Sequence, residues 1–124
     1  MKYMLLIYDA ETTLARMSPE EAQRFHEEYM KFTAEIGASG HLLGGDALES
    51  IHTATTVRIR EGKLSATDGP FAETREQLGG YYLIEARDLD EALQIAARVP
   101  SARTGSIEVR PLVTTYETPV AYQP

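Results

Sequence analysis

Gly79-Gly80-Tyr81-Tyr82-Leu83-Ile84-Glu85-Ala86 is followed closely by Asp88-Leu89-Asp90-Glu91. The first stretch is apolar and aromatic and begins at two glycines, which is typical of a β-strand. The second stretch places a capping Asp88 three residues before Glu91, which indicates the start of a helix. The apolar face of that helix comprises Leu89, Ala92, Leu93, Ala96 and Ala97. We therefore predict a strand at 81–86 and a helix that ends near 99–100.

A second strand and helix of the same kind open the chain. Residues 2–8 are short, apolar and aromatic, and they stop at Asp9. Ser18-Pro19-Glu20-Glu21 then supplies an N-cap serine, a proline at the first helical position and a glutamate three residues after the cap. Apolar residues follow at helical spacing, namely Ala22, Phe25, Tyr29, Phe32 and Ile36. The pattern predicts a strand at 2–8 and an amphipathic helix at 19–36.

Strand patterns occupy most of the remaining chain. Leucine and alanine at 42–48 predict a strand, which Gly44-Gly45 interrupts with a bulge or a close backbone approach. Residues 53–60 alternate and are rich in β-branched side chains, and a turn at 61–63 leads into 64–67, so we predict a hairpin. Residues 71–78 are polar and are predicted to be a loop with a helical turn. Residues 106–113 predict the last strand.

The order of these elements indicates the fold class. Strand, helix, strand, hairpin, strand, helix and strand form two β-α-β units, which is the ferredoxin-like split arrangement of an α+β protein. Its sheet is antiparallel and both helices cover one face. An exposed sheet face rarely carries as many aromatic residues as these strands supply, namely Tyr3, Tyr8, Tyr81 and Tyr82. We therefore expect a second copy to cover the other face of the sheet in a homodimer.

Composition limits the function classes. The 124 residues suit one domain, 1–124, with a tail at 115–124, and the 43% hydrophobic content excludes a disordered chain. The absence of cysteine excludes disulfides, iron–sulfur clusters and thiol catalysis. A net charge of −7 without a basic block argues against direct nucleic-acid binding. Without a long apolar run we expect no membrane association, and because the first apolar run stops at Asp9 we expect a cytoplasmic protein.

The segment 67–82 concentrates the polar groups that could carry chemistry. Asp68 could act as a general base at the mouth of a cleft between the helices and the sheet, with Arg75 as an anion anchor and Tyr81 or Tyr82 as a hydroxyl donor. Glu73 is a further candidate ligand-binding residue. In the alternative interpretation, Asp68 only caps its own turn and the Glu and Arg side chains are a solvated surface.

His26 is the histidine best placed for acid/base chemistry. It lies on the flank of the apolar arc of the 19–36 helix, where its ring could face a cleft, although a half-exposed boundary histidine would occupy the same position. His41 and His52 are expected at the surface. The histidines and Asp46 lack metal-ligand spacing, and the glycine pairs match no phosphate-binding motif, so we expect no metal and no organic cofactor.

Asp68-Gly69-Pro70-Phe71-Ala72-Glu73, continued by Glu76-Gln77-Leu78-Gly79-Gly80 and the strand after it, closely resembles the signature of DGPF-domain proteins. These proteins are a branch of the YCII-related family. The likeness extends from residues 1–8 to 107–111, about nine-tenths of the chain. The resemblance implies a ferredoxin-like fold that dimerises into an α+β barrel. It also implies that Asp68 belongs to the family motif.

The resemblance leaves two functions open. Most members of the branch have no assigned activity, but YCII-like relatives include a cofactor-free dehydrochlorinase with a proposed His–Asp pair. That implies a small-molecule binder or an acid/base enzyme of the elimination or isomerisation type, using Asp68, with His26 as the second candidate residue. Other members are encoded beside, or joined to, extracytoplasmic-function sigma factors. That implies a non-catalytic accessory module with a sigma-factor partner.

Overall fold

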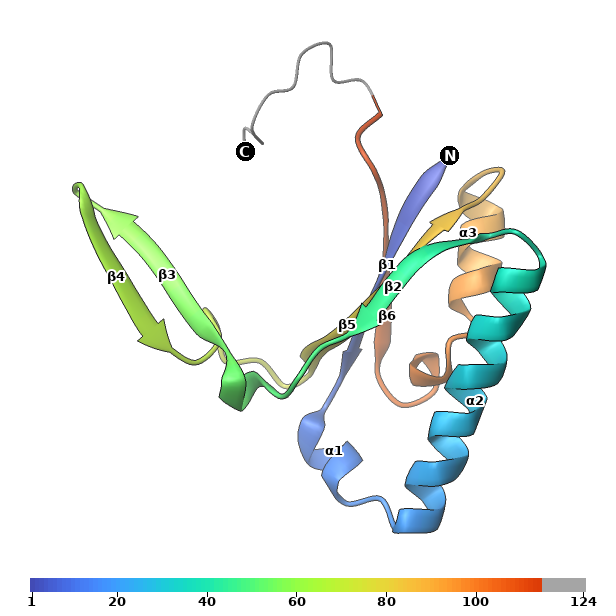
Figure 1. Cartoon of the computed structure of the whole chain (residues 1–124), viewed down its shortest axis with the longest axis horizontal. Coiled ribbons are helices and arrows are strands. Elements are labelled where there is room, and N and C mark those ends of the chain that lie inside the picture. Colours follow the sequence, from blue (N-terminus) through green and yellow to red (C-terminus); the bar gives the residue numbers. More distant parts are fainter. Residues whose placement is uncertain (115–124) are drawn as a thin grey trace.

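The computed structural model describes residues 1–114 of the chain (Figure 1). In chain order the helices and strands are β1 (Lys2–Asp9), α1 (Glu11–Ala15), α2 (Pro19–Ala38), β2 (Leu42–Ala47), β3 (Thr55–Arg60), β4 (Lys63–Asp68), β5 (Gln77–Glu85), α3 (Leu89–Ala96) and β6 (Ser106–Pro111). Two single 3₁₀ turns, Ile51–Thr53 and Pro100–Ala102, lie in the connections. The predicted tail at 115–124 lies outside the described residues.

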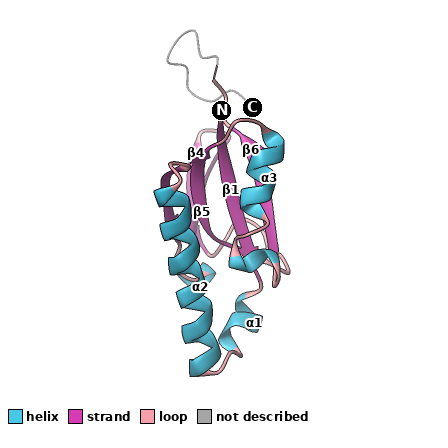
Figure 2. Cartoon of the chain, turned by 90° about the vertical axis from the view of Figure 1, so that its right-hand side faces the viewer, coloured by secondary structure: helices cyan, strands magenta, loops and turns pink. Residues whose placement is uncertain are grey.

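The main sheet has the strand order β2-β5-β1-β6, and every neighbouring pair is antiparallel. This order confirms the ferredoxin-like α+β prediction. Helices α2 and α3 lie side by side over one face of the sheet (Figure 2). Strands β3 and β4 form the predicted hairpin, which is a separate two-stranded sheet projecting away from the helices (Figure 1). Within residues 1–114, no helix combines the length and apolar character needed to cross a membrane.

Both ends of α2 follow from local sequence. Ser18 Oγ accepts a hydrogen bond from the Glu21 backbone N–H at 3.1 Å, with Pro19 at the first helical position. At the other end Gly40 adopts a φ of 80°, while its N–H donates to the Gly37 carbonyl and that of His41 donates to the Ile36 carbonyl. That pair of bonds is a Schellman motif, which ends the helix at Ala38, two residues later than predicted.

The core lies between the helices and the sheet. On β1, the alternating residues Tyr3, Leu5 and Ile7 are buried, and they pack with Phe32 and Ile36 of α2 and with small residues of α3. The Phe32 ring meets the Tyr82 ring edge-on with centroids 5.3 Å apart, and the Arg98 guanidinium lies 5.7 Å from the Phe32 centroid. Phe32 is therefore the main contact between α2 and the sheet.

Two sheet predictions concerned the tyrosines and the glycines. Tyr3 and Tyr82 were expected with Tyr8 and Tyr81 on the uncovered face, but both belong to the core side, since Tyr3 is buried and Tyr82 packs against the core cluster. The predicted disruption at Gly44-Gly45 is confirmed, because the β2–β5 register shifts between Leu42 and Gly44. The close approach is at Gly45, where an added Cβ would lie 2.7 Å from the Tyr81 carbonyl oxygen.

Helix α1 was not predicted, and β5 begins at Gln77, whereas the strand was predicted from residue 81. The N-cap of α1 is Ala10, which contributes no side-chain hydrogen bond. Instead, the Glu11 backbone N–H donates to the Gln77 side-chain oxygen at 2.9 Å, 66 positions away along the chain. Because this contact is non-local, no local sequence pattern predicts α1.

The packing of α2 predicts which of two substitutions lowers the free energy of unfolding more. Phe32→Ala should lower the free energy of unfolding by about 3–5 kcal/mol, because it removes a buried ring and leaves a cavity. Ser18→Ala should cost about 1 kcal/mol, because it removes one cap. Chemical denaturation of both variants measures the difference, and equal losses would contradict the assignment of Phe32 as the main α2 contact.

Candidate functional site

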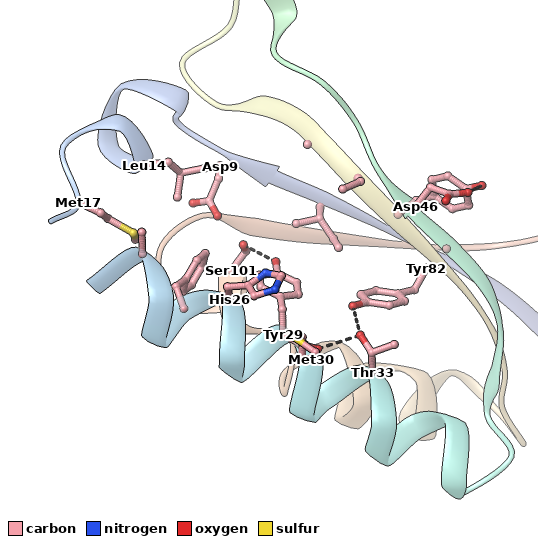
Figure 3. A pocket seen from close by; sticks show the side chains of 18 of the residues that line it. Asp9, Leu14, Met17, His26, Tyr29, Met30, Thr33, Asp46, Tyr82 and Ser101 are labelled. Carbon is pink, nitrogen blue, oxygen red and sulfur yellow. Dashed lines mark hydrogen bonds between the residues drawn. The ribbon is translucent and has the colours of Figure 1, made fainter. Parts of the chain in front are cut away.

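A cavity of about 800 Å³ lies between the sheet and α2, whose lining residues run from Ala22 to Ala34. One wall is α2, with Phe25, His26, Tyr29, Met30 and Thr33, and the opposite wall is formed by β1, β2 and β5 (Figure 3). Leu14 of α1 and Met17 close one end of this space. The lining is predominantly apolar, with a few polar groups, which is the usual composition of a small-molecule site.

Space exists here because the sheet presents almost no side chains to this part of α2. Cross-strand pairing places Gly45 opposite Tyr82 and Ala47 opposite Gly80. These small residues share the face of the sheet that carries Tyr82, beneath α2. An added Cβ at Gly80 would lie 2.8 Å from the Asp46 carbonyl oxygen. Neither glycine can therefore be enlarged without moving the two strands, and the volume that side chains would otherwise fill stays open.

Helix α1 is held at the end of the cavity by Glu11. Its carboxylate accepts hydrogen bonds from the Ser50 hydroxyl at 2.7 Å and from the Ile51 backbone N–H at 3.0 Å. These bonds, that from Ser50 foremost, lower the pKa of Glu11 below its ordinary value because they favour the charged form. Glu11 thus connects the wall of the cavity to the connection between β2 and β3.

Tyr29 supplies a hydroxyl inside the cavity. It donates to Ser101 Oγ at 2.5 Å, and Ser101 is itself 2% exposed. Burial raises the pKa of Tyr29, so its phenol stays protonated as a donor at neutral pH. Ser101 accepts this bond and keeps its own hydroxyl proton.

A second pair of hydroxyls lies one turn further along α2. Thr33 Oγ1 donates to the Tyr29 carbonyl at 2.8 Å and lies 2.6 Å from the Tyr82 hydroxyl (Figure 3). Because Thr33 has a single hydroxyl proton, Tyr82 is the donor in the second bond. The Tyr82 oxygen therefore keeps lone pairs that can accept a hydrogen bond from a ligand.

Asp9 brings a carboxylate to the sheet side of the cavity. It ends β1 on the same face as Tyr3, Leu5 and Ile7, and it is 5% exposed. Its two oxygens accept bonds from the Thr104 hydroxyl at 2.9 and 3.1 Å. A buried carboxylate with so few partners keeps acceptor capacity for a ligand or a proton.

His26 faces the same cavity from α2, opposite the sheet (Figure 3). Its side chain is exposed overall, so the ring lies at the mouth of the cavity. Imidazole is the side chain that most readily exchanges protons near neutral pH. Among residues 1–114, no group of three or more His, Asp or Glu side chains is arranged to hold a metal ion.

The other candidate residues from the sequence lie elsewhere. Asp68 ends β4, is exposed, and lines a separate pocket of about 520 Å³ with His52, Gly69, Pro70 and Glu73. The expectation that Asp68 shares the helix–sheet cleft with Tyr81 or Tyr82 is therefore wrong within one chain. Turn geometry explains the difference, because Gly69, at a φ of 107°, directs the chain from the projecting hairpin back to the body.

Arg75, Tyr81 and Tyr82 are also separated from one another. Arg75 is exposed and lines neither pocket. Tyr81 contributes to the cavity wall, but its hydroxyl donates to the Asp46 carboxylate at 3.3 Å, and these two paired residues lie on the face of the sheet opposite the helices. Only Tyr82 among these three candidates offers its hydroxyl to the cavity.

Four residues of the site were not predicted from the sequence, namely Asp9, Tyr29, Thr33 and Ser101. Asp9 carried a usable signal, because it continues the inward alternation of Tyr3, Leu5 and Ile7 and a carboxylate at such a position is unusual. Tyr29 was assigned to the apolar face without a partner for its hydroxyl. Thr33 and Ser101 join the site through contacts 49 and 72 positions apart along the chain, which no local pattern records.

The YCII-related domain profile matches residues 1–115. The chain belongs to the YCII-related family. A relative, the uncharacterized protein R00369 of Rhizobium meliloti (strain 1021), is 40% identical over 114 residues, which cover 90% of this chain and 92% of that protein. The motif that carries the family resemblance, Asp68-Gly69-Pro70-Phe71, thus lies beside the smaller pocket rather than in the cavity.

A solved structure similar to this YCII-related chain is the 5-chloro-2-hydroxyhydroquinone dehydrochlorinase TftG from Burkholderia phenoliruptrix AC1100, in complex with 2,5-dihydroxybenzoquinone. The TM-score is 0.56 at 11% sequence identity, and the match covers 93% of this chain and 96% of that one. At this identity the likeness concerns the fold.

The hydrogen bonds of Glu11 predict a pH effect on stability. Because the pKa of Glu11 is lowered in the folded protein, its contribution to stability is complete above its ordinary pKa and is lost as the pH falls through the folded value. Glu11→Gln should therefore be less stable than wild type at pH 7, and the gap should narrow towards pH 3. Urea denaturation across that range measures it, and a gap independent of pH would contradict the effect.

Proposed function

We propose that this protein binds a small, mostly apolar molecule in the helix–sheet cavity and moves a proton on it without metal or organic cofactor. The observation that carries the proposal is the meeting of His26, the buried Asp9 and the hydroxyls of Tyr29 and Tyr82 around one apolar space. Apolar pockets with few convergent polar groups are the usual sites of small-molecule binding.

The charges of the cavity narrow the ligand class. Its acidic lining residues are Asp9 and Asp46, and none of the described residues that line it is lysine or arginine. A phosphate or polycarboxylate would meet no fixed cation there, and it would be repelled by Asp9. Aromatic walls from Phe25, Tyr29 and Tyr82 favour a flat, uncharged or weakly acidic molecule with oxygen substituents.

His26 is the proposed base. In its neutral form the imidazole takes a proton from an acidified C–H or O–H of the ligand, and the electron pair left behind forms a new double bond. In an elimination, a leaving group departs as an anion with its bonding electrons. In an isomerisation, the proton returns to another atom of the same molecule, so both routes balance without an external oxidant or reductant.

Asp9 and the hydroxyls have supporting roles in this proposal. The Asp9 carboxylate stabilises the positive charge that His26 acquires, or accepts a hydrogen bond from a ligand hydroxyl. The Tyr82 oxygen accepts a ligand hydrogen bond, since its own proton is directed to Thr33. Both groups therefore orient the ligand before the proton moves.

Two substitutions test the location of the chemistry. Resorcinol, a flat and weakly acidic ring with two hydroxyls, is a suitable probe because it is uncharged at neutral pH, and exchange of its ring protons in D₂O, followed by NMR, reports proton transfer. His26→Gln should reduce the protein-catalysed exchange rate by about 10²–10⁴-fold, while Asp68→Asn should leave it unchanged. His26 is exposed, so the fold should tolerate its replacement.

Several results would contradict this assignment. Wild-type exchange rates in His26→Gln would exclude His26 as the base, and loss of exchange in Asp68→Asn alone would move the site to the smaller pocket. Failure of wild type to bind resorcinol or any other uncharged hydroxylated aromatic ring would favour the non-catalytic accessory module. Ala47→Phe is a control for the location of the binding site. Its larger side chain should fill the cavity and abolish both binding and exchange of the probe, although His26 itself is unchanged.

We also infer a homodimer formed through the open face, which is the surface of the main sheet opposite the helices. The register pairs Met4 with Leu83 and Leu6 with Tyr81 on this face, and all four side chains are half-buried without cover from any described element. An apolar sheet face of this kind packs favourably on a second sheet.

Sedimentation equilibrium tests the dimer. Wild type at micromolar concentration should have twice the mass calculated for one chain. Leu6→Glu should shift the measured mass towards that of the monomer, because a charge would be buried against an apolar surface. A wild-type mass equal to that of a single chain would contradict the dimer and leave the cavity proposal standing.

A further inference from the structure

The hairpin of β3 and β4, which we call the arm, is the least covered part of the fold. Its twelve strand residues are all exposed except one. It projects from the body on the side of the main sheet away from the helices, as both views show (Figures 1 and 2). An isolated two-stranded ribbon is at best marginally stable in water. We therefore expect a partner surface to stabilise the arm.

The two faces of the arm differ in chemistry. Val57 pairs with Ala66, and Ile59 pairs with Leu64, so these four side chains lie on one face. Val57, Ile59 and Leu64 are 61%, 64% and 70% exposed. The opposite face carries Arg58, Arg60 and Lys63 together with hydroxyl residues. An exposed apolar face on a ribbon this short is typical of an interaction surface.

Charge indicates which partner fits. Residues 55–68 contain three basic and two acidic side chains, so the arm carries a formal charge of +1, while the rest of the chain carries −8, which together give the total of −7. The arm is thus attracted to the body of this same protein more than to another arm. The open face adds three acidic side chains, Asp46, Glu85 and Glu108, against two basic ones, Lys2 and Arg110.

We infer that the arm docks on a second copy of this chain, with Val57, Ile59 and Leu64 against the part of the partner's open face that the sheet-to-sheet contact leaves uncovered. The inference rests on the proposed dimer, because a copy that packs on the open face enters the space beside the arm. In a twofold dimer each arm covers the other protomer, so one contact is made twice. Arg58, Arg60 and Lys63 lie on the opposite side of the ribbon, so their charges act on the acidic body of the partner at longer range rather than through direct contact.

Two neighbouring residues on β4 give a matched test. Leu64 and Ser65 are both exposed and point to opposite faces of the arm, so Leu64→Glu and Ser65→Glu add the same charge at nearly the same place. Leu64→Glu should weaken dimerisation at least about tenfold, while Ser65→Glu should change the dissociation constant less than about threefold. Fluorescence-detected sedimentation from nanomolar to micromolar concentration measures both, and circular dichroism confirms that each variant is folded.

The possible results distinguish a failure of the arm inference from a failure of the proposed dimer. If Leu64→Glu dimerises as wild type does, or if both glutamate variants are weakened equally, the arm does not dock through its apolar face. If Leu6→Glu dissociates the dimer while Leu64→Glu does not, only the arm inference fails. If wild type is a monomer, the proposed dimer fails and the arm inference fails with it.

Discussion

The packing of α2 against the sheet at only one of its ends determines both the core and the cavity. Phe32 and Ile36 are its buried residues, and both lie in its C-terminal half. There they meet Tyr82 and the core residues of β1 and α3. Towards its N-terminus the helix faces Gly45, Ala47 and Gly80, which offer no bulk to pack against. A 20-residue helix is rigid, so it spans this gap and keeps it open.

An open space of this kind persists only if its polar groups are satisfied and its ends are held. Tyr29 donates to Ser101, and Tyr82 donates to Thr33, so each phenol that reaches the cavity has a partner within the protein. Arg103 pairs with Glu28 and Arg98 pairs with Glu35, which fastens the outer side of α2 to the segment after α3. Exposed ion pairs add little stability each, so their main effect is on the position of the helix.

Local patterns predicted the architecture well and the site poorly, for one physical reason. The Ser18 and Asp88 caps are short-range features, and each one determined the residue at which a helix begins. The cavity is a product of long-range contacts, because Asp9, Tyr29, Thr33, Tyr82 and Ser101 come from four separate elements. His26 was a candidate from its position on α2, whereas Asp68 was assigned to the wrong cleft because a turn motif does not indicate the direction in which a hairpin projects.

The tyrosine pair on β5 links the two proposed roles of the sheet. Successive side chains of a strand point to opposite faces, so Tyr82 reaches the cavity under α2 while Tyr81 reaches Asp46 on the open face. A slip of one residue in the pairing of β5 would exchange them and would place Gly80 where Tyr81 now lies. The bulge between β1 and β5 at Ile7 and Tyr8 falls just beyond this pair and limits such a slip. Cavity and open face therefore share one register, yet they lie on opposite sides of the sheet, so a substitution on one side can alter its function while the other side keeps its geometry.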